Sequence, residues 1–201
     1  LAESSPGVIW IGTVDGLFRY ANDELTEFRT REGLISDHIT ALRATSANQL
    51  WIGTDKGLSS YNGATFTNYD TSNGLPGNEI RCIAVDTAKQ LWVGTHSGLG
   101  LFTNPGFRRF QTADGLSHND ILAIAPEADG KLLLGTTRGI NRFDGEVFSV
   151  PLWYQPARTS KVTSILIESP RSLWLGTWNG VLRSNGEATQ SFRTRDGLPN
   201  N

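Results

Sequence analysis

Short apolar runs recur along the chain at a constant spacing. Trp-Ile-Gly-Thr at Trp10 returns at Trp51, as Trp-Val-Gly-Thr at Trp92, as Leu-Leu-Gly-Thr at Leu133 and as Trp-Leu-Gly-Thr at Trp174, always at the same interval. Both alternating positions of such a run are apolar, as expected for a strand that is covered on both faces of its sheet. A period of about forty residues with several short strands per unit indicates a β-propeller.

The third unit shows how the strands divide one repeat. We expect its four strands at 79–86, 90–95, 98–103 and 107–112. Asn-Gly and Asp-Gly pairs, which favour two-residue hairpins, separate the third and fourth strands at Asn62-Gly63, Asp144-Gly145 and Asn185-Gly186. The sequence therefore predicts one all-β domain, residues 1–201, made of five four-stranded blades. The blade cores are expected around Trp10, Trp51, Trp92, Leu133 and Trp174.

The alignment of the chain ends with the repeat leaves two arrangements open. Leu1 aligns with Leu42 and Asn201 aligns with Asn78, so the first inner strand is expected to be mostly missing. The five blades then form either a five-bladed ring with an open seam or five blades of a larger ring. We favour the first arrangement, because blades left with open faces would expose a large apolar surface.

An up-and-down sheet places the loops of every blade on two opposite edges. We call the edge with the turns between first and second and between third and fourth strands the hairpin rim. The other edge, which we call the loop rim, holds the loops between second and third strands. It also holds the Gly-Leu segments that lead to the next blade, at Gly33, Gly74, Gly115 and Gly197.

One segment carries a family resemblance. The string Gly-Leu-Pro-x-Asn-x-Ile-x-x-Ile-Ala-x-Asp, followed by Leu-Trp-x-Gly-Thr-x-x-Gly-Leu, spans residues 74–99 and returns more loosely in the other units. It resembles the two-component regulator propeller repeat. The resemblance implies a bacterial, periplasmic or extracellular sensor region of a histidine kinase, often a hybrid one, or of a diguanylate cyclase. It also implies seven-bladed rings, usually in pairs, and it carries over no catalytic residue because the motif is architectural.

Charge and hydropathy narrow the range of partners. The net charge of −2 argues against binding to nucleic acid or an anionic membrane through bulk electrostatics, and we predict neither. No apolar stretch approaches the roughly 18 residues of a membrane span, and the first residues lack the features of a signal peptide. Cys82, the single cysteine, aligns with Ala41 and Ala123 and is expected to be a small buried residue.

The best candidate site lies on the loop rim, where the repeat fixes a frame and leaves pairs of positions free. Between a fixed Thr and a fixed Gly stand Val14-Asp15, Asp55-Lys56, His96-Ser97, Thr137-Arg138 and Trp178-Asn179. Matching places before the inner strands hold Asp37-His38, Asn78-Glu79, Asn119-Asp120 and Ser160-Lys161. We expect these residues to surround the central opening and to contact a ligand. The alternative is that they are exposed loop residues whose variation has no functional consequence. Asn78 and Asn119 are expected to cap turns through their side chains rather than to contact a ligand.

The fourth unit departs from the repeat without changing its length. Residues 151–161 replace the Gly-Leu loop with aromatic, proline and basic residues, which suit a sugar ring or an anionic glycan, although its aromatic rings would equally serve to fill space. The repeated tryptophans, in contrast, are expected in the core. The full set of candidate ligand-binding residues is Asp55, Lys56, His96, Arg138, Trp178, Asn179, His38, Glu79, His118, Asp120, Trp153, Tyr154, Arg158 and Lys161.

The candidate chemistry favours binding over catalysis. His38, His96 and His118 fall on the loop rim but come from different units without chelating spacing, so we predict no metal and no cofactor. Signatures such as Gly-x-Ser-x-Gly and His-Glu-x-x-His are absent. The sequence thus predicts a non-enzymatic module that binds a small molecule or oligosaccharide and reports to signalling domains. The alternatives are a protein-docking or dimerisation scaffold, and a lyase or hydrolase that uses His96, His118 or Glu79 as acid and base.

Overall fold

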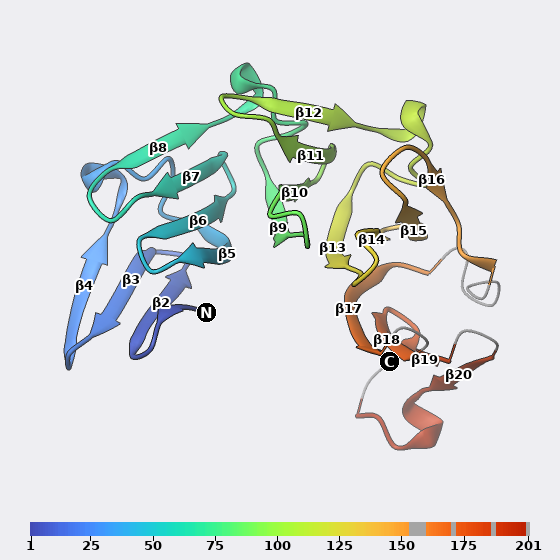
Figure 1. The fold of residues 1–201 in the computed structure, drawn as a ribbon. Coiled ribbons are helices and arrows are strands. Elements are labelled where there is room, and N and C mark those ends of the chain that lie inside the picture. Colours follow the sequence, from blue (N-terminus) through green and yellow to red (C-terminus); the bar gives the residue numbers. More distant parts are fainter. Residues whose placement is uncertain (153–159, 170–171, 186–187, 200–201) are drawn as a thin grey trace.

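The computed structural model describes residues 1–152, 160–169, 172–185 and 188–199. Five four-stranded antiparallel sheets follow one another along the chain, each with its strands in sequence order. The sheets lie side by side along an open arc, with the first blade at one end and the fifth at the other (Figure 1). The predicted all-β architecture of five four-stranded blades is confirmed.

The strands of blade 3 begin and end close to the predicted positions, and blades 1 and 2 repeat the same order of strands. Blade 1 contains β1 (Ala2–Ser5), β2 (Val8–Thr13), β3 (Gly16–Ala21) and β4 (Glu24–Phe28). Blade 2 contains β5 (Ile39–Ser46), β6 (Gln49–Thr54), β7 (Leu58–Tyr61) and β8 (Phe66–Tyr69). Blade 3 contains β9 (Ile80–Val85), β10 (Leu91–Thr95), β11 (Gly98–Phe102) and β12 (Phe107–Phe110).

The last two blades follow the same plan. Blade 4 contains β13 (Ile121–Pro126), β14 (Leu132–Thr136), β15 (Gly139–Phe143) and β16 (Phe148–Ser149). Blade 5 contains β17 (Val162–Ser169), β18 (Ser172–Thr177), β19 (Gly180–Ser184) and β20 (Thr189–Phe192). One-turn 3-10 helices lie in the Gly-Leu segments: η1 (Thr30–Glu32), η2 (Thr71–Asn73), η3 (Thr112–Asp114) and η5 (Thr194–Asp196).

The innermost strands contact one another in succession from β1 through β5, β9 and β13 to β17. The expectation that the first of them is mostly missing is wrong. β1 has four residues, half the length of β5, and it pairs with β2 through Ala2 opposite Trp10. Blade 1 is therefore a complete four-stranded sheet.

The glycine of each Trp-x-Gly-Thr run permits the close approach of the next blade. A Cβ atom on Gly94 of β10 would lie 2.5 Å from Sγ of Cys82 and 2.9 Å from Cγ2 of Ile121, the first residue of the next inner strand. Neither distance is compatible with a real side chain, so a larger residue would push two blades apart. The repeat therefore retains glycine here for packing.

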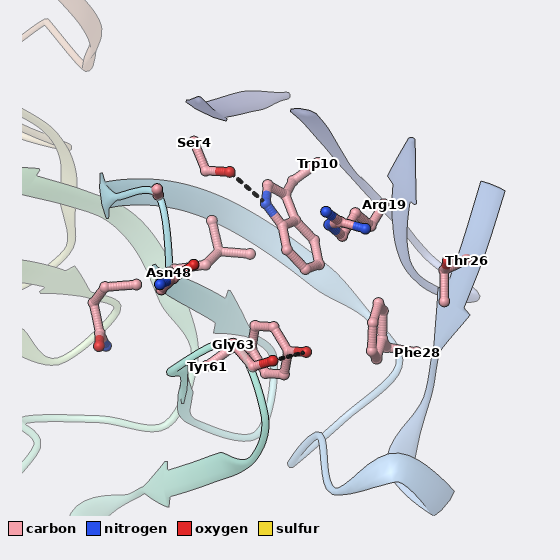
Figure 2. Close-up of a pocket in the computed structure, with 11 residues that line it drawn as sticks. Ser4, Trp10, Arg19, Thr26, Phe28, Asn48, Tyr61 and Gly63 are labelled. Atoms are coloured by element: carbon pink, nitrogen blue, oxygen red, sulfur yellow. Dashed lines mark hydrogen bonds between the residues drawn. The ribbon is translucent and has the colours of Figure 1, made fainter. Parts of the chain in front are cut away.

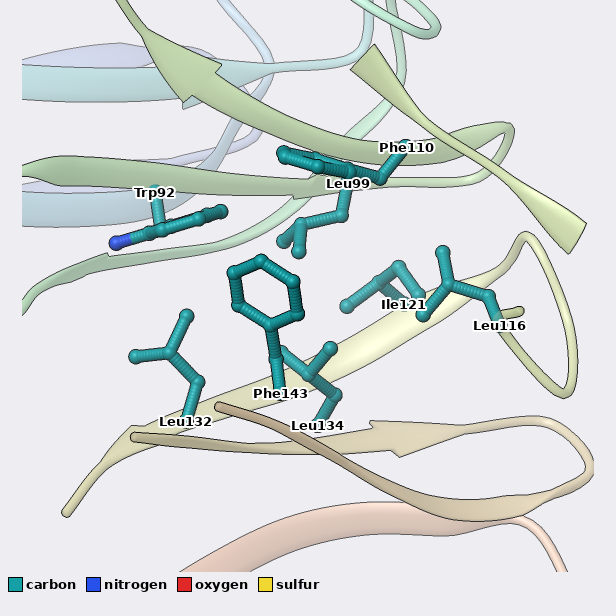
Figure 3. Packing of buried hydrophobic residues seen from close by; sticks show 8 residues of the cluster. All are labelled: Trp92, Leu99, Phe110, Leu116, Ile121, Leu132, Leu134 and Phe143. Atoms are coloured by element: carbon teal, nitrogen blue, oxygen red, sulfur yellow. The ribbon is translucent and has the colours of Figure 1, made fainter. Parts of the chain in front are cut away.

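Aromatic rings join the first four blades. Between blades 3 and 4, Trp92 and Phe110 pack against Phe143, with ring centroids 5.7 and 5.4 Å apart, and Leu132 and Leu134 complete the cluster (Figure 3). A fourth ring, Phe148, lies 4.5 Å from Phe143. Such pairs contribute about 0.5–1.5 kcal/mol beyond the burial of their surface. The same quartet recurs as Trp10, Phe28, Tyr61 and Phe66, and as Trp51, Tyr69, Phe102 and Phe107.

The interface between blades 4 and 5 is built differently. The four ring positions are occupied here by Leu133, Pro151, Ser184 and Thr189. The core is aliphatic instead, with Leu133, Ile140, Val162, Leu175 and Leu182 buried together.

Trp174 of blade 5 corrects one expectation. The repeat predicts it in the core with the other repeated tryptophans, of which Trp10, Trp51 and Trp92 are buried, yet Trp174 is only half-buried. Trp174 packs on Phe192 of its own blade at 5.7 Å, whereas the other three also pack on a ring of the next blade, which explains the difference.

Candidate functional site

The loop rim has one fixed backbone frame in every blade. The hydroxyl of Thr95, at the end of β10, donates to the carbonyl of Gly98 at 2.9 Å and accepts from the amide of Ser97 at 3.0 Å. The threonines at the matching positions of the other four blades make the same two bonds. The loop is therefore closed through threonine and glycine, and the two residues between them are free to vary.

A second loop of the same blade lies directly beside the first. The amide of His96 donates to the carbonyl of Glu79 at 3.1 Å, and the amides of Thr137 and Trp178 do the same to Asp120 and Lys161. The two members of each pair have the same separation in sequence. Blades 2 to 5 therefore present paired positions on the loop rim, filled by His38 and Asp55, Glu79 and His96, Asp120 and Thr137, and Lys161 and Trp178.

Three of the predicted residues come together between blades 3 and 4, around an arginine. Arg81, on the inner strand β9, places Nη1 2.7 Å from Oε1 of Glu79 and Nε 3.3 Å from Oδ1 of Asp120. Nδ1 of His96 lies 3.6 Å from the same Asp120 oxygen. Asp120 is buried while His96 is exposed. Sequence reasoning missed Arg81, although its place close to Glu79 at the start of an inner strand was a usable signal.

The other two histidines have separate partners. Nδ1 of His38 lies 3.7 Å from Oδ2 of Asp55, whose other oxygen accepts a 2.6 Å bond from the hydroxyl of Ser36. Nδ1 of His118 lies 2.6 Å from the hydroxyl of Thr137 and accepts from the amide of Asp120. Within the described ranges, no three His, Cys, Asp or Glu side chains are grouped closely enough to hold a metal ion.

Blade 5 contributes an exposed aromatic residue. Trp178 is 67% exposed, and Nζ of Lys161 lies 4.7 Å from its ring centroid, which is a cation–π contact. Nδ2 of Asn179 donates to the hydroxyl of Ser160 at 3.1 Å. Lys56 and Arg138 are exposed on the loops of blades 2 and 4. Trp153, Tyr154 and Arg158 lie outside the described residues.

The predicted capping residues have the expected structural role. Oδ1 of Asn78 accepts from the amide of Thr71 at 2.9 Å, and Oδ1 of Asn119 accepts from Thr112 at 2.8 Å. Asp37 does the same for Thr30 in the preceding loop. These side chains tie each 3-10 turn to the strand that follows it.

The hairpin rim, which sequence reasoning did not consider as a site, contains clefts between blades. The cleft between blades 1 and 2 has a volume of about 240 Å³ and is lined by Trp10, Phe28 and Tyr61 together with Ser4, Arg19 and Asn48 (Figure 2). Ser4 accepts a 3.1 Å bond from the indole of Trp10, and the Arg19 guanidinium lies 6.0 Å from the same ring. Trp10 thus both packs in the core and borders a cleft.

Two further clefts have the same position but different charges. Between blades 2 and 3, a cleft of about 600 Å³ is lined by Arg43 and Lys89 beside Trp51 and Phe102. Between blades 4 and 5, a cleft of about 350 Å³ is lined by Glu127, Asp129 and Glu168 around Arg142.

Ion pairs fill the acidic cleft between blades 4 and 5. Arg142 pairs with Glu127 at 2.5 Å and with Asp129 at 3.3 Å. The hydrogen bond to Glu127 raises the pKa of Arg142, and the bond from Lys131 lowers the pKa of Asp129. Its charges are therefore largely satisfied within the protein, unlike those of the cleft between blades 2 and 3.

Comparison with known proteins finds one similar repeat family and several solved structures with a similar fold. Two of its repeats, residues 33–56 and 74–97, match the sequence profile of the two-component regulator propeller. These two segments are therefore similar to two-component regulator propeller repeats. No curated protein matches it in sequence.

Solved structures share the fold over nearly the whole chain. The extracellular domain of a hybrid two-component system from B. thetaiotaomicron is 22% identical with a TM-score of 0.77, and the alignment covers 92% of this chain and 27% of that one. The extracellular domain of a one-component system from the same organism is 25% identical with a TM-score of 0.77, covering 94% and 26%. Virginiamycin B lyase from Staphylococcus aureus is 16% identical with a TM-score of 0.70, covering 96% and 68%.

The chain spans only about a quarter of the two extracellular domains that it resembles. The likeness to the lyase, at its low identity, shows the fold alone. In the part of the chain that is described, no helix has the length and hydropathy of a membrane span.

Proposed function

We propose that this propeller is an extracytoplasmic, non-enzymatic sensor module of a bacterial signalling protein, and that it binds a small molecule or oligosaccharide on its loop rim. The repeat match and the similar extracellular domains support the signalling role. The observation that carries the binding role is the set of paired positions on blades 2 to 5. A constant backbone frame displays side chains that differ from blade to blade, which is how a repeat scaffold acquires specificity without changing its fold.

Blade 5 supplies the most suitable contact surface on this rim. Trp178 offers an exposed ring, Lys161 a cation and Asn179 an amide within one loop pair. A ring stacked on Trp178, with polar groups directed to Lys161 and Asn179, matches the way that proteins hold sugars and other polar cyclic ligands.

A thermal-shift screen of the purified chain against oligosaccharides, sugar acids and amino acids tests this proposal. A ligand at about 100 times its Kd stabilises the folded state by ~2.7 kcal/mol, which raises Tm by several degrees for a chain of this size. We expect a hit that is lost in Trp178→Ala and Lys161→Ala. Val14→Ala is the matched control, because Val14 occupies the Trp178 position of blade 1 and is 65% exposed.

A second function, protein docking, is favoured by the same exposed Trp178, since aromatic residues are enriched in protein interfaces. A screen without any hit, on a chain that is folded, would contradict the ligand-binding proposal. Dimerisation of the chain that depends on Trp178, measured by light scattering, would then support the docking function.

A further inference from the structure

The cleft between blades 2 and 3 combines two positive charges with an aromatic wall. Arg43 enters it from β5 and Lys89 from the β9–β10 turn, so the two cations come from different blades. Arg43 stands opposite Trp51 in the β5–β6 register and therefore shares its face of the sheet. Phe102 of β11 lies 5.2 Å from the Trp51 ring and closes the wall on the side of blade 3.

Neither cation is neutralised within the described residues. Arg43 and Lys89 make no ion pair there, and no carboxylate lines the cleft. The nearest acid in the β9–β10 turn, Asp86, is engaged on the other face of blade 3, where it accepts from the indole of Trp92 at 2.8 Å. The cleft therefore keeps two positive charges available to an anion.

Both cations depart from the repeat. The positions that match Arg43 hold alanine in blades 1, 3 and 4, at Ala2, Ala84 and Ala125. Alanine is thus sufficient for the fold at this position, and the packing of the blade does not require an arginine.

Lys89 keeps the left-handed backbone that the matching glycines have and departs from the repeat only in its residue type. Its φ of +64° lies in the left-handed region, where Gly130 stands in blade 4 with a φ of +85°. Lysine in this conformation is strained, and such strain is kept mainly where the side chain has a task. Two independent departures, far apart in sequence, converge on one cleft.

The cleft between blades 1 and 2 shows what the same architecture looks like without these departures. Its ring quartet is equivalent, but Asn48 replaces Lys89 and Ala2 replaces Arg43. Its one cation, Arg19, lies over Trp10, whereas the matching neighbour of Trp51 is the small Ser60. The aromatic wall is thus general to the fold, and the paired positive charge is specific to the cleft between blades 2 and 3.

We propose that the cleft between blades 2 and 3 on the hairpin rim binds a small organic anion, a ring that carries a carboxylate or sulfonate. The anionic group lies between Arg43 and Lys89, and the ring lies against Trp51 and Phe102. The side-chain amide of Gln90 also lines the cleft and is available to polar substituents of the ring. The hydroxyl of Thr45, which donates to the carbonyl of Gln49 at 3.5 Å, can accept a bond from them. Charge-assisted hydrogen bonds from two cations provide the affinity. Because the ligand bridges two blades, it also stiffens the arc at this point.

The test measures binding to the purified chain by calorimetry and thermal shift. The probes are benzoate and glucuronate, with benzamide and glucose as their neutral counterparts and sulfate as an anion without a ring. We expect benzoate or glucuronate to bind and to raise Tm, and the neutral counterparts and sulfate to have no comparable effect. Which of the two anions binds distinguishes an aromatic acid from a sugar acid.

Three variants assign the binding to this cleft. Arg43→Gln and Lys89→Gly are each expected to weaken binding about tenfold or more, the loss that corresponds to one charge-assisted hydrogen bond. Lys89→Gly also relieves the strained backbone, so it should fold at least as well as the parent chain and separates loss of binding from loss of structure. Arg19→Gln is the matched control, because it removes one cation from the cleft between blades 1 and 2.

Binding that survives in Arg19→Gln and is lost in the other two variants confirms the proposal. No binding by either anion, equal binding by sulfate, or equal losses in all three variants overturns it. These outcomes are independent of the loop rim. Trp178→Ala should leave this binding unchanged, so failure of one proposed site does not decide the other.

Discussion

The indole of Trp92 donates a hydrogen bond from Nε1 to Oδ2 of Asp86 at 2.8 Å, and both side chains are buried. Oδ1 of the same carboxylate accepts from the amide of Gln90 at 2.9 Å. One side chain therefore fixes both the turn between β9 and β10 and the ring that joins blade 3 to blade 4. In blade 1 the hydroxyl of Ser4 accepts from the indole of Trp10 at 3.1 Å in its place.

Replacement of Asp86 by alanine should destabilise the protein more than replacement of Ser4. The first change leaves a buried indole N–H without its ionised acceptor, which we expect to lower the free energy of unfolding by ~2–3 kcal/mol, against ~1 kcal/mol for Ser4→Ala. Urea unfolding of the two variants measures the difference. Equal losses would show that the carboxylate has no special role.

The glycine at the start of the third strand should not tolerate substitution where the backbone of the fourth strand would contact an added Cβ atom. Gly98 has a φ of +146°, and a Cβ atom there would lie 2.7 Å from the carbonyl oxygen of Phe110. Gly145, at a φ of +106°, has no atom within 4 Å of such a Cβ. We expect Gly98→Ala to cost ~3 kcal/mol and Gly145→Ala only the ~1 kcal/mol of the unfavourable φ. Thermal unfolding of both variants checks this, and equal costs would contradict it.

Cys82, expected to be buried, is half-buried as a residue, but its thiol faces the protein interior and should be unreactive while the protein is folded. Its Sγ lies 3.7 Å from the carbonyl oxygen of Ile121, and burial raises its pKa from 9.0 to about 12. We expect slow labelling by iodoacetamide at pH 8 in the folded state and rapid labelling in urea, with Cys82→Ala as the unlabelled control. Rapid labelling of the native protein would disprove the enclosure of the thiol.

The raised pKa of Cys82 makes the stability of the protein depend on pH. Above pH 9 the unfolded chain releases the thiol proton, whereas the folded protein, in which the pKa is raised, keeps it until about pH 12. The unfolded state then binds fewer protons than the folded state, so stability should fall as the pH rises through this window. Cys82→Ala should show a smaller fall over the same range, because alanine, the residue at the matching positions of blades 2 and 4, has no proton to lose. Identical pH profiles of the two proteins would refute this linkage.

Blade 5 should open more readily than blade 1, although both stand at an end of the arc. Blade 1 is joined to blade 2 by the ring quartet of Trp10, Phe28, Tyr61 and Phe66, whereas the described residues form no such quartet between blades 4 and 5. A difference of ~1 kcal/mol or more corresponds to several-fold faster amide exchange. Hydrogen-exchange mass spectrometry compares β18 with β2. Equal protection would show that the aliphatic packing around Leu175 is as strong as the rings.

The repeat made the architecture predictable, since the constant interval between the Trp-x-Gly-Thr runs determines how often the sheet motif returns. The strands of blade 3 end within two residues of their predicted limits. The burial predicted for Trp174 was wrong, because burial of a repeated residue depends on the neighbouring blade. Its position in the repeat does not indicate whether such a neighbour is present.

The sites were less predictable than the fold. The loop-rim pairs could be placed from the repeat, because the residues that hold the frame are local in sequence. The contact between Arg81 and Asp120 and the cleft shared by Arg43 and Lys89 join different blades, so their geometry depends on how sheets pack. Comparison of each position with its copies in the other repeats was the available signal, and at Arg43 and Lys89 it marks the departures from alanine and glycine.

The bond from Thr95 to the carbonyl of Gly98 closes the loop without using the side chains of the two residues between them. The residues that the fold requires are therefore different from those that the loop rim exposes. His96 and Ser97, between them, help to close the loop only through their backbone amides. Substitutions of such surface side chains usually change stability by less than about 0.5 kcal/mol. A threonine and a glycine close the loops of the other four blades in the same way. The side chains of each loop can therefore be substituted separately. During evolution such a propeller can acquire a new binding specificity without passing through a destabilised variant.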